Sequence, residues 1–237
     1  MRNALIISLL FLVPWKGFAK TNPGPNIYII YYATRDGKTG HVGIAVDTYR
    51  ILYRQAEKDG KTIEVEDTVA TGELNYFDLW PREDEFDVFA TVKDIPATYY
   101  RLPVSSTEEI TVNSLMDKGL PHKERYACDG LLKIPASWSQ QEMIIQFLDS
   151  LIQSGRDFNA QKFNCTDFVR LALERLLHQK IDATEFIFVG RSSTPNKLYR
   201  ELRKIPSVEV VKNADQLAKG SFLKERILHR NRDVGQQ

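Results

Sequence analysis

Apolar residues in the first third of the chain occur in short runs with the period of β-strands. Asn26 to Ala33 is rich in β-branched and aromatic residues and is apolar at nearly every position, which is typical of a strand buried on both faces. Later runs are separated by turn sequences such as Lys58-Asp59-Gly60-Lys61. The pattern predicts strands over residues 26–33, 39–47, 50–56, 62–70, 72–81 and 86–92.

The second half of the chain follows the period of amphipathic helices. An apolar stripe predicts a helix over about 140–154, with Ser137 or Ser139 as its cap. A second helix begins at Cys165 and runs to about residue 178, because apolar residues recur every three or four positions and Asn164 is a good cap. Further signals are an apolar segment over 185–189, a helix start at Thr194-Pro195-Asn196 and a short strand over 208–211. Strands followed by helices predict an α+β fold.

The chain divides into a leader and one domain. Residues 1–3 are positively charged, residues 4–15 are almost wholly apolar, and small residues favour cleavage after Ala19. This is typical of a secretory signal peptide, and the apolar run is too short to span a bilayer. We therefore predict an exported protein, periplasmic or extracellular, with a single domain over residues 20–237. Within it, four prolines punctuate residues 93–137, which predicts an elaboration between the sheet and the later helices.

The charge balance is close to neutral. The 237 residues carry a formal net charge of +1, and removal of the leader, which contains Arg2 and Lys16 and no acidic residue, changes it to −1. A near-neutral domain has no general attraction for nucleic acid, so we expect no such partner. The mature chain has no apolar run long enough to cross a membrane. It also lacks the common metal-binding, phosphate-binding and GxSxG motifs, so we expect no cofactor or metal.

Cys165 has the most specific placement of any reactive residue in the predicted fold. The N-terminus of a helix favours the thiolate form of a cysteine, which is the nucleophilic form. The alternative is a disulfide with Cys128, because an exported chain with two cysteines invites one. Cys128 has no catalytic context of its own, and we interpret it as a small packed residue.

A cysteine nucleophile needs a histidine within hydrogen-bonding reach. His178 lies 13 positions along the same helix, about 20 Å from Cys165. His122 and His229 lie in a proline-flanked segment and in the polar tail. His41 is on a predicted core strand, and small residues beside it favour the close approach of another element, such as a helix. The residues on its face of that strand are Gly43, Ala45 and Asp47. We therefore predict that His41 is the partner of Cys165.

Two motifs carry a resemblance to a known family. Gly40-His41-Val42-Gly43-Ile44 on a strand, followed much later by Asn164-Cys165-Thr166-Asp167-Phe168-Val169 at a helix start, resembles the circularly permuted papain-like proteins. These are relatives of the NlpC-type cell-wall peptidases and include the lecithin retinol acyltransferase-like enzymes. The resemblance implies an antiparallel sheet packed against the cysteine-bearing helix. It also implies that Cys165 is the nucleophile, that His41 is the general base and then acid, and that the backbone N–H of Cys165 helps to form an oxyanion hole.

The family usually has a third polar residue, on a neighbouring strand, that orients the imidazole. We favour Asp78 for its chemistry and its plausible strand, with Tyr53, at about the usual offset after the histidine, as the alternative. Asp47 shares the face of His41 but lies about 20 Å along the strand. The prediction is thus an exported thiol hydrolase, associated with the cell envelope, that cleaves an amide such as a cell-wall peptide through an acyl-enzyme. Lipid acyl hydrolysis or transfer and a non-catalytic binding module are the alternatives.

Overall fold

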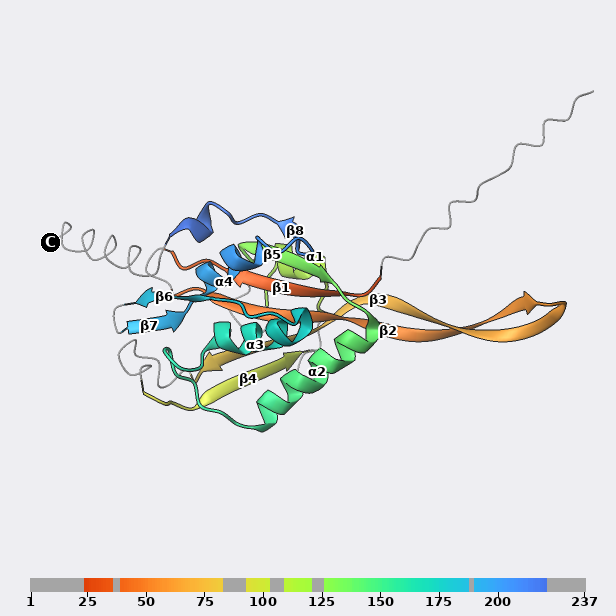
Figure 1. Cartoon of the computed structure of the whole chain (residues 1–237), viewed down its shortest axis with the longest axis horizontal. Coiled ribbons are helices and arrows are strands. Elements are labelled where there is room, and N and C mark those ends of the chain that lie inside the picture. The colour runs from red at the N-terminus through yellow and green to blue at the C-terminus, as the bar shows by residue number, and fades with distance from the viewer. Residues whose placement is uncertain are drawn as a thin grey trace, which may run out of the picture.

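The computed structural model describes residues 24–35, 39–82, 93–102, 109–120, 126–187 and 190–220. The predicted leader at 1–19, the predicted strand at 86–92, His122 and His229 lie outside these ranges. The strands are β1 (Asn26–Tyr32), β2 (His41–Lys58), β3 (Lys61–Pro81), β4 (Ala97–Leu102), β5 (Gly130–Pro135), β6 (Thr184–Ile187), β7 (Gly190–Ser193) and β8 (Glu209–Lys212). The helices are α1 (Val112–Asp117), α2 (Trp138–Gln153), α3 (Cys165–Leu177) and α4 (Pro195–Leu202), with a short 3-10 helix η3 (Leu217–Lys219). Figure 1 shows their arrangement.

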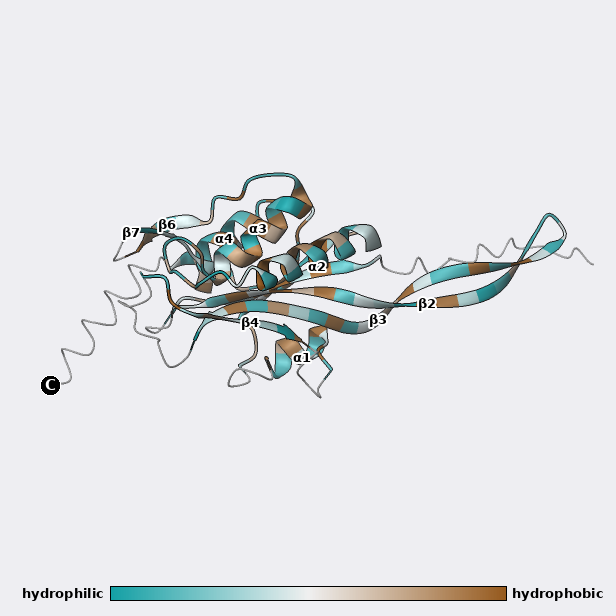
Figure 2. Ribbon diagram, turned by 90° about the horizontal axis from the view of Figure 1, so that it is seen from below, coloured by the Kyte–Doolittle hydropathy of each residue, from teal (hydrophilic) through white to brown (hydrophobic). Residues whose placement is uncertain are grey.

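Six strands form an antiparallel sheet in the order β4-β3-β2-β1-β5-β8, and β6 pairs with β7 in a separate hairpin. Helices α2, α3 and α4 lie on one side of the sheet, the three-helix face, and α1 lies on the other, the α1 face (Figure 2). This architecture confirms the predicted α+β class.

The block at 93–137 is more than an elaboration, because it supplies two strands of the main sheet. Strand β4 pairs with β3 at one edge, and β5 pairs with the central strand β1. The prolines that obscured these strands stand at or beside their ends: Pro96 precedes β4, and Pro135 is the last residue of β5. Proline is tolerated at such positions because it interrupts few ladder hydrogen bonds there.

Strand β1 separates two hydrophobic cores. Ile27 and Ile29 belong to the cluster that also holds Phe168 of α3, on the three-helix face. Tyr28 and Ile30 belong to a second cluster with residues of α1, on the α1 face. Because both faces of this strand are covered, apolar residues are required at nearly every position. The prediction of a buried strand at 26–33 is confirmed.

Four of the predicted strands are joined in pairs. Residues 39–47 and 50–56 lie in the single strand β2, and residues 62–70 and 72–81 lie in β3. At the junction, three residues of β3 stand opposite Thr48 alone, and Gly72 among them has a φ of 88°. A bulge of this kind bends a strand without ending it. The turn predicted at Lys58-Asp59-Gly60-Lys61 joins β2 to β3. It is confirmed, since Asp59 and Gly60 both have positive φ, as a two-residue hairpin turn requires.

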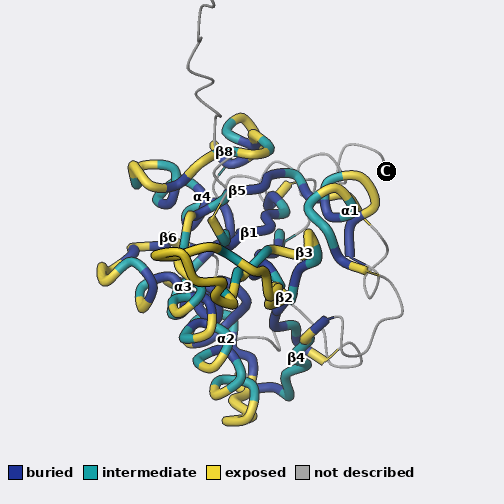
Figure 3. Tube along the Cα trace, turned by 90° about the vertical axis from the view of Figure 1, so that its right-hand side faces the viewer, coloured by how far each residue is buried: buried dark blue, intermediate teal, exposed yellow. Residues whose placement is uncertain are grey.

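The outer half of this hairpin, residues 49–70, projects from the body as a two-stranded arm (Figure 1). Strand β1 pairs with β2 only over residues 41–46, and β4 pairs with β3 only over 76–81, so no other described strand extends along the arm. Figure 3, seen along the arm, shows it as an exposed segment in front of the buried strands.

The local helix signals in the sequence are accurate. Ser137 caps α2 by accepting a hydrogen bond from the N–H of Gln140. Thr194 caps α4, and Pro195 occupies the first helical position, where its missing N–H has no consequence. Helix α3 begins at Cys165, as predicted. These ends are determined by residues three or four positions apart, which explains why the sequence alone locates them.

Candidate active site

Cys165 is placed by the capping of α3. The side-chain oxygen of Asn164 accepts hydrogen bonds from the N–H groups of Thr166 (2.8 Å) and Asp167 (3.3 Å). The carboxylate of Asp167 in turn accepts the N–H of Asn164 at 3.3 Å, which completes a capping box. The N–H of Cys165 has no part in these bonds and lies at the first helical position. The thiol therefore stands at the positive end of the helix dipole.

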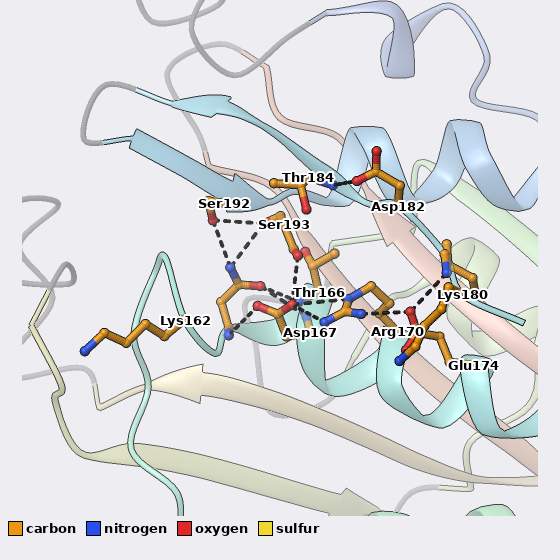
Figure 4. A network of polar contacts seen from close by, with 12 residues as sticks. Lys162, Thr166, Asp167, Arg170, Glu174, Lys180, Asp182, Thr184, Ser192 and Ser193 are labelled. Carbon is orange, nitrogen blue, oxygen red and sulfur yellow. Dashed lines mark hydrogen bonds and ion pairs between the residues drawn. The ribbon is translucent and has the colours of Figure 1, made fainter.

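The β6–β7 hairpin holds this end of α3 from outside the sheet. The amide group of Asn164 donates to the Ser192 hydroxyl (3.2 Å) and to the Ser193 carbonyl (3.1 Å), and the Ser193 hydroxyl donates to Asp167 at 2.7 Å (Figure 4). Arg170, one turn along the helix, forms an ion pair with Asp167 at 3.0 Å. These contacts fix the helix start, and the guanidinium offsets the acidic charge next to Cys165. The capping pattern identified Asn164 and Asp167, but nothing in the sequence pointed to the two serines.

His41 is the first residue of β2 and is buried. The pairing of β2 with β3 runs from the hairpin turn to Ile44 opposite Phe77, so His41 lies just beyond the last pair. Its Nε2 is 3.0 Å from the carboxylate oxygen Oδ2 of Asp78. The Trp80 indole stacks on the imidazole, with ring centroids 4.0 Å apart and planes 25° apart. The ring is therefore held on one face and at one nitrogen.

Asp78 is fully buried and lies at the centre of a cluster on one face of β3. Its Oδ2 accepts hydrogen bonds from Tyr76 Oη and from Trp80 Nε1, both at 2.8 Å, in addition to the contact with His41. Three polar partners at one oxygen are the arrangement that stabilises a buried carboxylate. The alternation Tyr-x-Asp-x-Trp on one strand was the available signal that all three side chains share a face.

The pKa of His41 reflects both its burial and its neighbours. Burial lowers this pKa. The negative charge on Cys165 and the hydrogen bonds to Asp78 and Cys165 have the opposite and larger effect, so the pKa rises from its ordinary value to about 9. Since Nε2 contacts Asp78, Nδ1 is the ring nitrogen left for the thiol. His41 thus lies between residues from two other elements: Asp78 of β3, which its Nε2 contacts at 3.0 Å, and Cys165 of α3, whose interaction raises the pKa of the imidazole. At neutral pH the imidazole carries a proton.

The small residues beside His41 serve a purpose that differs from the predicted one. The body of helix α3 shares a core with Val42 and Ile44 on the opposite face of β2, and only its first residue, Cys165, reaches His41. A Cβ placed on Gly43 would instead lie 2.1 Å from the hydroxyl oxygen of Tyr76. The glycine makes room for the tyrosine that donates to Asp78.

The alternative third residue, Tyr53, lies far from His41. It lies on the arm, paired with Glu66, and its exposed fraction is 60%. Twelve residues of strand separate it from His41, which is roughly 40 Å at 3.3 Å per residue. Asp47 is also remote, as predicted, and its carboxylate accepts the N–H of Asn26 at 2.8 Å. His178 caps the opposite end of α3 from Cys165.

Both cysteines are free thiols, so the alternative of a disulfide between them does not hold. Cys165 belongs to the core on the three-helix face, whereas Cys128 is packed in the core on the α1 face. The sheet lies between these cores. Burial raises the pKa of Cys128 to about 11, which suits the predicted role of a small packed residue.

Other features of the described residues add no second centre of this kind. They contain no group of three or more His, Cys, Asp or Glu side chains arranged to bind a metal ion. None of the described helices is long and apolar enough to span a bilayer. Comparison of the chain with protein-family models, with curated proteins and with solved structures gives no match. The function of the chain is therefore inferred from the geometry of the site.

Proposed function

We propose that this chain is a cysteine hydrolase of the permuted papain-like kind, in which Cys165 is the nucleophile. The observation that carries the proposal is the buried chain of contacts from Asp78 through His41 to Cys165 at the start of a helix. A nucleophile, a base and a residue that orients the base are the parts that acyl transfer through a thiol requires. Asp78 would hold the imidazole in place and stabilise its positive charge.

In the first half of the proposed reaction, the Cys165 thiolate attacks the carbonyl carbon of an amide. A C–S bond forms, and the carbonyl oxygen takes the negative charge, next to the backbone N–H of Cys165 at the helix start. When the tetrahedral intermediate collapses, the C–N bond breaks and the nitrogen takes the proton from His41. The amine leaves, and the acyl group stays on Cys165 as a thioester.

In the second half, neutral His41 takes a proton from water, and the water oxygen attacks the thioester carbon. The C–S bond then breaks, which releases the carboxylic acid and restores the thiolate beside a protonated His41. A raised pKa at His41 favours this cycle for amides, because an amine leaves only with a proton and His41 is protonated at neutral pH. The predicted leader is the basis for proposing an exported enzyme, and a cell-wall peptide is the substrate we favour.

Reaction with iodoacetamide tests the proposal. The alkylated residue would be identified by mass spectrometry in the wild type, in Cys165→Ala, in His41→Ala and in Cys128→Ser. We expect rapid alkylation at Cys165 well below pH 8, a marked loss of rate in His41→Ala, and no change in Cys128→Ser. The last variant is the matched control, because it removes the other buried thiol.

An unreactive Cys165 in the folded chain would rule out the hydrolase and favour a binding module on the same scaffold. Reactivity that is unchanged in His41→Ala would remove His41 from the mechanism. The substrate class would be tested with cell-wall peptides and with phospholipid esters as separate substrates. Hydrolysis of the esters alone would replace the amide proposal with lipid acyl hydrolysis.

A further inference from the structure

The two faces of the arm carry opposite charges. Directly paired residues of an antiparallel ribbon point to the same face, so the register assigns every side chain. One face, the basic face, has four cationic residues and one carboxylate: Arg50, Arg54, Lys58, Lys61 and Asp67. The other, the acidic face, has three carboxylates and no cation: Glu57, Glu64 and Glu66. The arm is therefore polarised across its thickness, while the whole chain is nearly neutral.

The apolar residues are also divided between the faces. Aliphatic residues alternate with the cations on the basic face: Leu52, Ala56, Ile63, Val65 and Val69. The acidic face carries Tyr49, Ile51, Tyr53 and Ala70. At its root, Tyr49 packs on Trp138 of α2 with ring centroids 4.8 Å apart. At the tip of the basic face, Lys58 and Lys61 stand directly opposite each other, which destabilises a ribbon unless an anion is near.

We propose that the basic face of the arm is a docking surface for an anionic phospholipid bilayer. Aliphatic side chains interleaved with Lys and Arg are the composition of protein surfaces that lie at an anionic membrane interface. The acidic face opposes binding on the wrong side, so the arm docks in one orientation. The arm also needs a partner on physical grounds, because an isolated two-stranded ribbon is only marginally stable. On its basic face, Leu52 and Ile63 are about 40% exposed.

A bilayer fits this face better than a second copy of the chain. Contact between two basic faces or between two acidic faces would bring like charges together. A basic face could bind an acidic face of another copy, but that contact is heterologous and leads to rings or filaments rather than to a two-fold dimer. Docking on lipid brings anionic headgroups to the cations of the basic face of a single chain and leaves the acidic face in water.

The arm is remote from the site of the proposed reaction. His41 and Lys58 stand at opposite ends of β2, roughly 55 Å apart at 3.3 Å per residue. Lipids that contact the arm are therefore out of reach of Cys165. This last step rests on the proposed function: the arm attaches the enzyme to the membrane and does not bind its substrate.

Vesicle binding tests the docking surface. Residues 20–237, without the predicted leader, would be sedimented with vesicles of equal phosphatidylglycerol and phosphatidylcholine, and with vesicles of phosphatidylcholine alone. We expect binding to the first kind only. The arm variant Arg50→Gln, Lys58→Gln, Lys61→Gln should bind about a hundredfold more weakly, since each cation near an anionic surface contributes about tenfold or somewhat less. Leu52→Ser with Ile63→Ser should also weaken binding, with no change of charge.

The matched control removes three exposed cations from the body: Lys162→Gln, Lys180→Gln and Lys204→Gln. It has the same net charge as the arm variant and should bind as the wild type does. Equal binding to both kinds of vesicle, full binding by the arm variant, or an equal loss in the body variant would each overturn the proposal. So would concentration-dependent oligomers without vesicle binding, which would indicate docking between copies. Cys165→Ala should bind vesicles normally, so failure here and failure of the hydrolase proposal are distinguishable.

Discussion

The substitution Asp78→Asn isolates the electrostatic contribution of the buried carboxylate at the candidate site. Asparagine has nearly the same shape, and its side-chain oxygen can still accept from His41, Tyr76 and Trp80. What the change removes is the negative charge. Without that charge, only the interaction with Cys165 opposes the lowering of the His41 pKa by burial. The pKa of His41 should therefore fall below its value of about 9.

The size of the effect follows from the contacts. A hydrogen bond to a charged acceptor contributes about 1 kcal/mol more than one to a neutral acceptor, and three such bonds give about 3 kcal/mol. Relief from burying a charge offsets part of this, so we expect a net loss of about 2 kcal/mol. That is less than the total stability of a typical domain, so the variant should fold. Each unit by which the His41 pKa falls reduces the ratio of imidazolium to imidazole tenfold.

The assay is the rate of iodoacetamide alkylation at Cys165 from pH 5 to pH 10. Near pH 7 the Asp78→Asn rate should be lower, because each unit by which the His41 pKa falls shifts the thiolate–imidazolium pair about tenfold toward the unreactive neutral thiol and imidazole. Near pH 10 the two rates should converge, since an ordinary thiol is ionised there. The control is Asp47→Asn, which neutralises another carboxylate of the sheet that bonds Asn26 and is remote from His41. Identical pH profiles for Asp78→Asn and the wild type would refute the role given to Asp78.

Three further predictions concern packing and helix capping, and a fourth concerns proton linkage. Gly43→Ala should lower the free energy of unfolding by about 1–3 kcal/mol and the melting temperature by several degrees, because the new Cβ overlaps the hydroxyl of Tyr76. Asn164→Ala should lower it by about 1–2 kcal/mol in urea unfolding, through loss of the α3 cap. Cys128 should react with thiol reagents only in denaturant, since it is buried and its pKa is raised to about 11. Protonated His41 contributes to the free energy of unfolding measured in urea, because its pKa is raised on folding. This contribution should be fully present below pH 6.5 and lost as the pH rises to about 9.

Specific outcomes would contradict these predictions. Gly24→Ala is the control for the glycine, since a Cβ there meets nothing within 4 Å. If both glycine variants melt together, the contact with Tyr76 has no energetic weight. An Asn164→Ala chain as stable as the wild type would show that β6–β7 alone holds the start of α3. Alkylation of native Cys128 would contradict its placement in the core, and a His41→Asn variant with the same pH dependence of stability would contradict the proton linkage.

Local features of the sequence are enough to locate the candidate nucleophile. The start of α3 depends on Asn164 and Asp167, which are three residues apart, and on the helical period of the residues that follow. The strand at His41 and the turn at Asp59 likewise depend on immediate neighbours. Helix caps, turns and alternation are short-range effects, so one chain is enough to recognise them.

Only the tertiary structure decided which residues meet His41. Asp78 and Tyr53 both lie on strands, and no local pattern distinguishes the buried end of a hairpin from its projecting arm. The register of β2 with β3 makes that choice, because it places Asp78 beside His41 and carries Tyr53 into solvent. Register depends on pairing between distant segments, on the bulge opposite Thr48 and on which faces are covered. The sequence by itself therefore determined the candidate nucleophile and its histidine, and the sheet determined the carboxylate, its aromatic partners and the arm.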